Sequence, residues 1–147
     1  MLEEIYSHEV VHREVLRQLI GTAVNNNQSM ILPALNFNYG SLNFGNRAQV
    51  LETARTLEDT GVAAYTGAGR YIENVNNLIL AGKIVSVEGR HASVIRSMIN
   101  PNDAYFTAPD VVEPATGKNE IMLPSQVIDM LDEANFITTQ FSATHLP

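Results

Sequence analysis

Residues Ile84–Arg96 read IVSVEGRHASVIR, and within them Glu88 and His91 form a Glu-x-x-His motif. A spacing of three places both side chains on the same face of a helix, one turn apart. A second copy of the motif, Glu9 with His12, lies near the start of the chain. Two such helices that face each other can present two carboxylates and two imidazoles to one point. The pair of motifs therefore indicates a metal site inside a helical bundle.

A third candidate carboxylate lies between the two motifs, in Leu57–Ala68, which reads LEDTGVAAYTGA. Glu58 shares a helical stripe with Val62 and Tyr65, whereas the neighbouring Asp59 does not. We therefore expect Glu58 to face inward, and Asp59 to be either a supporting partner of the site or a surface residue. An ionised carboxylate in a helical core is costly unless it is paired or bound to a cation. A shared metal would reduce that cost for all the inward carboxylates.

The hydrophobic periodicity predicts an all-α fold, with three long helices, a short C-terminal helix and no strand. The predicted helices are residues 2–20, 46–72, 75–99 and 124–137. Asn46 and Asn74 are the expected N-caps of the second and third helices. A long connection rich in Asn and Gly, residues 21–45, follows the first helix, as expected for a bundle with a long crossover. We expect one domain over residues 1–137 and a C-terminal tail over residues 138–147.

Charge and cysteine content exclude several classes of function. The net charge is -7 and the basic residues are scattered, which argues against nucleic-acid binding. The absence of cysteine excludes disulfides, thiolate zinc sites and iron–sulfur clusters, so any metal would depend on carboxylate and imidazole. No apolar run reaches the ~20 residues of a membrane-spanning helix. The residues after Met1 do not resemble a signal peptide, and the sequence leaves the compartment open.

From residue 2 to residue 99 the chain resembles the ferritin-like family that includes bacterial exported ferritin-like proteins and plant desiccation-related proteins. The resemblance is carried by LEDTGVAAYTGA at Leu57–Ala68, by IVSVEGRHASVIR at Ile84–Arg96, and by SHEVVHREVLRQLIG at Ser7–Gly21. It implies a ferritin-like four-helix bundle that binds iron or manganese. Members of the family are often exported, although few of them have an established activity.

The resemblance also implies how a dinuclear iron or manganese site would be built. Glu9 and Glu88 would bridge the two ions, His12 and His91 would each bind one of them, and Glu58 would be a terminal ligand. Such a site would serve iron handling or chemistry with dioxygen or peroxide. The resemblance assigns no catalytic residue and no substrate, so whether the protein is an enzyme stays open.

The family's first helix has no counterpart in this chain, which begins at what resembles the second. We therefore expect a homo-oligomer, a companion chain that supplies the missing helix, or a chain that is itself a fragment. The alternative function is a non-enzymatic structural, stress-protective or assembly subunit with a degenerate metal site. In that case Glu9 and His12 would lie on a solvated face, and Glu88 and His91 would satisfy each other by hydrogen bonding.

Overall fold

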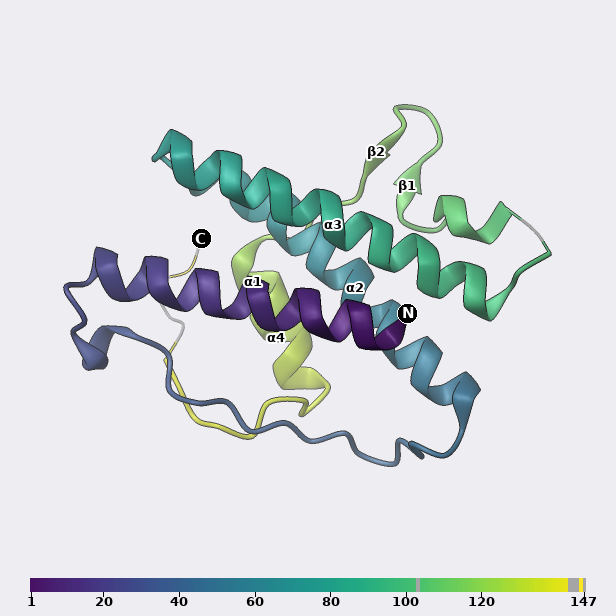
Figure 1. Ribbon diagram of the computed structural model, residues 1–147, viewed down its shortest axis with the longest axis horizontal. Coiled ribbons are helices and arrows are strands. Elements are labelled where there is room, and N and C mark those ends of the chain that lie inside the picture. The colour runs from purple at the N-terminus through teal and green to yellow at the C-terminus, as the bar shows by residue number, and fades with distance from the viewer. Residues whose placement is uncertain (103, 143–145, 147) are drawn as a thin grey trace. The chain divides into compact units, whose positions relative to one another are not determined.

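The structure is a computed structural model that describes residues 1–102, 104–142 and 146. The described chain divides into two compact units. The first contains Met1–Asn38 and Ile137–Ser142, and the second contains Tyr39–Phe136 with Leu146. Most of the regular structure is helical, as Figure 1 shows, which confirms the predicted all-α class. None of the helices in the described part combines the length and hydrophobicity that crossing a bilayer requires.

The first unit is built on helix α1, Leu2–Ala23. Acidic residues occupy its first turn, where they interact favourably with the helix dipole. The helix ends three residues later than predicted. Asn25 and Asn26 then adopt left-handed conformations, with φ of 50° and 57°, and the Asn26 N–H donates to the Gly21 carbonyl at 2.7 Å. Asn tolerates this conformation better than most residues, so the Asn-rich sequence after Ala23 explains where the helix stops.

The loop after α1 runs beside the C-terminal segment of the chain, as Figure 1 shows. The Thr138 N–H donates to the Asn36 carbonyl at 2.9 Å, and the Asn36 N–H donates to Thr139 Oγ1 at 2.7 Å. The start of the predicted tail, residues 138–147, is thus hydrogen-bonded within the first unit. Residues 143–145 and 147 of that tail lie outside the described residues.

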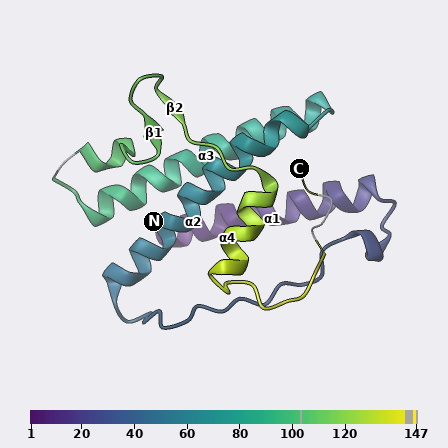
Figure 2. The same cartoon turned by 180° about the vertical axis from the view of Figure 1, so that it is seen from behind.

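The second unit contains two long helices that pack side by side, α2 (Arg47–Ala68) and α3 (Val75–Ile99), as Figures 1 and 2 show. Each begins at the predicted cap, Asn46 or Asn74, whose side-chain oxygen accepts hydrogen bonds from two backbone N–H groups of the first turn. Helix α3 has its predicted bounds. Helix α2 ends four residues early, because a 3-10 turn continues the chain at Gly69–Tyr71 (η2).

The hydrophobic core of the second unit lies between α2 and α3. Leu51 of α2 and Ile95 of α3 are each 1% exposed, and Ile84 of α3 is 4% exposed. The face of α3 that carries Glu88 and His91 is buried or half-buried along its length; it comprises Leu80, Ile84, Val87, Glu88, His91, Ile95 and Met98. The helical periodicity therefore identifies the correct face of α3.

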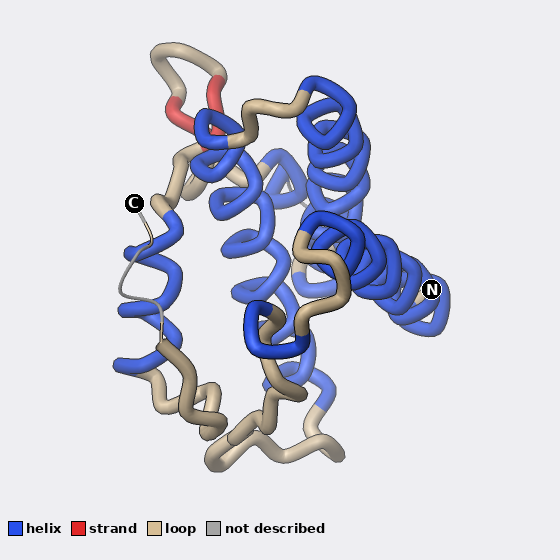
Figure 3. The backbone as a smooth tube through the Cα atoms, turned by 90° about the vertical axis from the view of Figure 1, so that its left-hand side faces the viewer, coloured by secondary structure: helices blue, strands red, loops and turns tan. Residues whose placement is uncertain are grey.

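A short hairpin follows α3, although the sequence predicts no strand. Strand β1 (Val112–Glu113) pairs antiparallel with β2 (Lys118–Asn119), and Figure 3 shows how short both are beside the helices. The last helix, α4 (Pro124–Glu133), packs against α2 and ends four residues before the predicted end. Two further 3-10 helices lie at Gln28–Met30 (η1) and Ala104–Thr107 (η3).

The chain between β2 and α4 crosses α2 closely. The Met122 N–H donates to the Ala63 carbonyl at 3.0 Å. A Cβ atom added to Gly67 would lie 1.9 Å from the Met122 carbonyl oxygen, a contact that neither backbone can accept without moving. Glycine at this helical position is therefore required by the crossing chain.

Replacing Gly67 by Ala is expected to lower the free energy of unfolding by about 1–3 kcal/mol, because the crossing chain must move away from α2. Gly61, on the same helix, has no atom within 4 Å of an added Cβ. Gly61→Ala is therefore the matched control, and should stabilise the protein by about 0.5–1 kcal/mol through helix propensity. Urea unfolding of both variants measures the difference. Equal stabilisation by the two substitutions would contradict the observed crossing.

Candidate metal centre

The second unit brings together three of the five predicted metal ligands. Glu58 extends from α2, and Glu88 and His91 extend from adjacent turns of α3. His91 Nδ1 lies 3.4 Å from Glu88 Oε2 and 3.5 Å from Glu58 Oε2. The three side chains are only 6% to 11% exposed. Two carboxylates from different helices thus converge on one imidazole in the interior, with Glu58 facing inward as predicted.

The spacing of these groups fits a bound cation. One ligand atom from each of Glu58, Glu88 and His91 lies within 4.8 Å of the others. The two contacts at His91 are longer than a good hydrogen bond, which spans about 2.7–3.2 Å. Two ligand atoms about 2.1 Å from the same ion, and about 109° apart, are separated by about 3.4 Å. A buried cluster of two carboxylates and an imidazole also has the charge and the ligand atoms that a divalent metal requires.

The first unit contains the other two predicted ligands, Glu9 and His12, one turn apart on α1. His12 Nδ1 lies 3.6 Å from Glu9 Oε1. The His12 side chain is 13% exposed and that of Glu9 is 44% exposed. The apolar residues that share their stripe, Ile5, Leu16 and Leu19, are half-buried. His12 therefore does not lie on a solvated face, whereas Glu9 remains close to solvent.

A buried ion-pair network that the sequence did not predict lies beside Glu58. Its centre is Arg96 of α3, which is fully buried. Its Nη2 donates to Asp59 Oδ2 at 2.6 Å, and its Nη1 donates to Asp110 Oδ1 at 2.6 Å. The guanidinium carbon lies 4.7 Å from the centre of the Tyr105 ring, in a cation–π contact. Asp59 is thus a supporting residue and not a surface residue.

Arg55 joins this network and balances its charge. Its Nη1 lies 3.2 Å from Asp59 Oδ2 and 3.7 Å from Asp110 Oδ2, so two arginines face two aspartates. The hydrogen bond from Arg96 holds the pKa of Asp110 below its usual range. Burial lowers the pKa of Arg96, but its hydrogen bonds to both carboxylates outweigh burial and raise it overall. Because Asp59 directly follows Glu58, the network fixes the helical turn that presents the Glu58 carboxylate.

A weak signal in the sequence could have revealed Arg96. It stands within the apolar end of α3, between Ile95 and Met98, on a helical face shared with the small residues Gly89 and Ala92. A charged residue on a face of small residues indicates burial against a partner. The partner Asp110, however, lies in an irregular segment whose position periodicity does not predict.

Comparison with known proteins adds a family assignment. A family model described as a ferritin-like domain matches residues 1–101. The chain belongs to the ferritin-like domain family. The match covers α1, α2 and α3, and so confirms that the chain is ferritin-like and that its fold is a helical bundle. All five predicted ligands lie within the ferritin-like domain, and its carboxylate–histidine cluster fits a metal site. Neither curated proteins nor solved structures give a match to the chain.

Proposed function

We propose that this ferritin-like protein binds a pair of iron or manganese ions and handles iron or reacts with dioxygen or peroxide. The observation that carries the proposal is the convergence of Glu58 and Glu88 on His91 in the interior of the second unit. Membership of the ferritin-like family supports it, because bundles of this kind hold di-iron or di-manganese sites with this ligand pattern.

The family pattern implies two Glu-x-x-His pairs as ligands of such a site. Glu88 and His91 would bind metal in the second unit with Glu58 as a terminal ligand, and Glu9 and His12 would be the remaining ligands that the resemblance implies. The carboxylates would neutralise the positive charge of the ions, and the imidazoles would add neutral nitrogen ligands. Iron or manganese bound in this way supplies redox chemistry toward dioxygen or peroxide.

A second copy of the chain or a companion chain would pack against α1. Support comes from α1, where apolar side chains remain accessible: Tyr6 is 70% exposed, Val11 59% and Ile20 46%. A helix laid against Tyr6 and Ile20, which lie on the same side of α1, would bury apolar surface, which favours association.

The second candidate function is a structural or stress-protective subunit that binds no metal. The Arg96 network favours it, because the interior of the second unit already holds the buried charges of Arg96 and Asp59 by pairing them with each other. In that case His91 would be the hydrogen-bond partner of both Glu58 and Glu88, and the three side chains would form a polar cluster without metal.

A metal titration separates the two functions. The chain is purified without chelators and analysed for iron and manganese. The metal-free protein is then titrated with Fe²⁺ under anaerobic conditions, with Mn²⁺, and with Mg²⁺ as the control. We expect up to two ions per chain and a stabilisation of about 2.7 kcal/mol at a free-ion concentration 100-fold above the dissociation constant. Admission of air to the Fe²⁺ form should then consume dioxygen. The absence of binding and of any thermal shift would support the structural function instead.

A further inference from the structure

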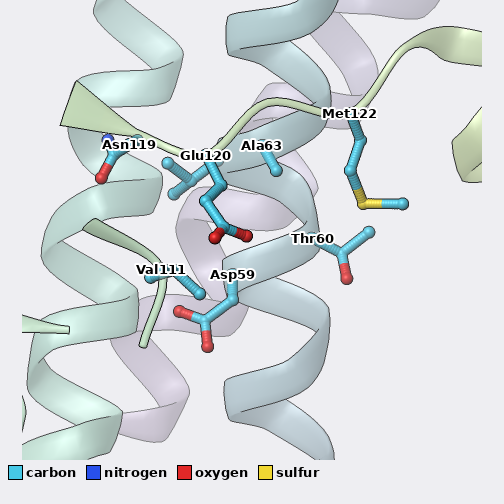
Figure 4. Close-up of a pocket in the computed structure, with 8 residues that line it drawn as sticks. Asp59, Thr60, Ala63, Val111, Asn119, Glu120 and Met122 are labelled. Carbon is cyan, nitrogen blue, oxygen red and sulfur yellow. The ribbon is translucent and has the colours of Figure 1, made fainter. Parts of the chain in front are cut away.

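Two adjoining hollows lie in the second unit, where the segment after α3 covers α2 and α3. The larger measures about 310 Å³ and has small residues of α3 at its base, including Gly89 and Ala92. The smaller measures about 130 Å³ and is lined by α2 and by residues near β2, as Figure 4 shows. Both linings include Asp59, Val62 and Val111, so the hollows share a wall. Their combined size lies in the lower range of small-molecule sites.

The base of the larger hollow is open space. A Cβ added to Gly89 would meet no atom within 4 Å, although this residue lies in a helix packed within the unit. Phe106 forms part of the wall and is 50% exposed, so one side of the hollow opens to solvent. The rest of the lining mixes Val and Ala side chains with the polar side chains of Asp59, Ser93, Thr107 and Asn119. A molecule of about the size of one aromatic ring could enter and be partly enclosed.

The charged groups that line the two hollows are both carboxylates, Asp59 and Glu120. Arg55 and Arg96, which balance Asp59, belong to neither lining. Figure 4 shows the Glu120 carboxylate extending over α2 on the same side as Asp59. Glu120 is exposed to solvent, and within the described part of the chain no side-chain hydrogen bond or ion pair of Glu120 is found. The hollows therefore combine apolar side chains with a solvent-exposed carboxylate that has no cationic partner among the described residues.

We propose that the two hollows form a binding site for a small organic cation with a single-ring apolar body and a primary ammonium group. The apolar body would occupy the larger hollow above Gly89, and the ammonium group would face Glu120 in the smaller one. An anionic molecule of the same shape is disfavoured, because both charged groups in the lining are negative. Asp59 and Gly89 directly follow the metal-ligand candidates Glu58 and Glu88, so the site uses other faces of the same helical turns. It does not depend on metal binding.

The test uses three molecules that share a phenylethyl body: 2-phenylethylamine, 2-phenylethanol and phenylacetate. Each is titrated into the metal-free, isotopically labelled chain at about 0.15 M salt, where long-range attraction to the net charge is screened. Amide NMR shifts report the affinity and the location. We expect the amine to bind about two- to fivefold more tightly than the alcohol, as an accessible ion pair contributes. We expect phenylacetate to bind most weakly, and the shifts to centre on Gly89, Val111 and Glu120.

Two pairs of variants test the position and the charge. Gly89→Leu would fill the larger hollow and should weaken amine binding at least tenfold, whereas Gly82→Leu, at an exposed position of the same helix, should leave it unchanged. Glu120→Gln should remove the preference for the amine over the alcohol. Glu133→Gln, which makes the same change in net charge on α4, should preserve it. Equal binding of amine and alcohol by the unaltered chain, no effect of Gly89→Leu, or shifts elsewhere would each overturn the proposal.

Discussion

Replacing Glu88 by Gln should weaken Fe²⁺ or Mn²⁺ binding at least ~100-fold, because the neutral amide is a poor ligand and a second-sphere change alone costs 10–100-fold. The same result is expected for His91→Gln, which removes the imidazole between Glu58 and Glu88. Glu73→Gln, which removes one exposed carboxylate just before α3, is the control and should bind metal normally. Equilibrium titration with each ion, followed by elemental analysis of the dialysed protein, measures the effect.

The stability of the metal-free Glu88→Gln variant separates the two proposed functions. If the cluster is built for a cation, removing one of its buried charges should leave the metal-free protein equally stable or more stable. If Glu88 and His91 are a structural pair, the same substitution should destabilise it. Urea unfolding in the presence of a chelator gives the answer. A clear loss of stability together with unchanged metal affinity would refute the metal site.

Replacing Arg96 by Met should lower the free energy of unfolding by about 3–5 kcal/mol, among the largest effects of any substitution in this chain. The methionine would fill much of the space, but Asp59 would keep a buried charge without its main partner, and such broken pairs are costly. The double variant Arg96→Met with Asp59→Asn should recover part of the loss, because the uncompensated charge is then removed. Arg90→Met, at an exposed position of the same helix, should change stability by less than about 0.5 kcal/mol.

Thermal and urea unfolding of these variants, of the single variant Asp59→Asn and of the unaltered protein, monitored by circular dichroism, provide the measurement. Non-additivity between the substitutions at positions 59 and 96 would give the coupling energy of the pair. If Arg96→Met is as mild as Arg90→Met, the buried network contributes little. The short distances of 2.6 Å from Arg96 to Asp59 and to Asp110 would then not correspond to a large contribution to stability.

Features encoded by nearby residues could be predicted from the sequence. Helix α3 has its predicted bounds because Asn74 caps it and Pro101 follows its end, and both effects act within a few residues. The contacts of Glu88 with His91 and of Glu9 with His12 follow from helical spacing alone. The inward position of Glu58 follows from the stripe that it shares with Val62.

Features that depend on distant residues could not be predicted in this way. The β1–β2 hairpin has strands of two residues each, too short for alternation to be detected. Arg96 has a partner from α2 and another from the segment after α3, so its environment exists only once the helices have packed. The contact between Glu58 and His91 likewise depends on the pairing of α2 with α3.

The partners of Arg96 bear on where an expression clone of this domain should stop. The recognisable family sequence ends at residue 101, and a truncation there would seem natural. Such a truncation would remove Asp110 and the Tyr105 ring. The buried guanidinium of Arg96 would then be exposed to water and would keep only one of its two carboxylate partners. The truncation would also remove the segment that crosses α2 at Gly67, which includes Met122. Residues 102–123 therefore complete the interior of the second unit, and a self-sufficient clone has to include them.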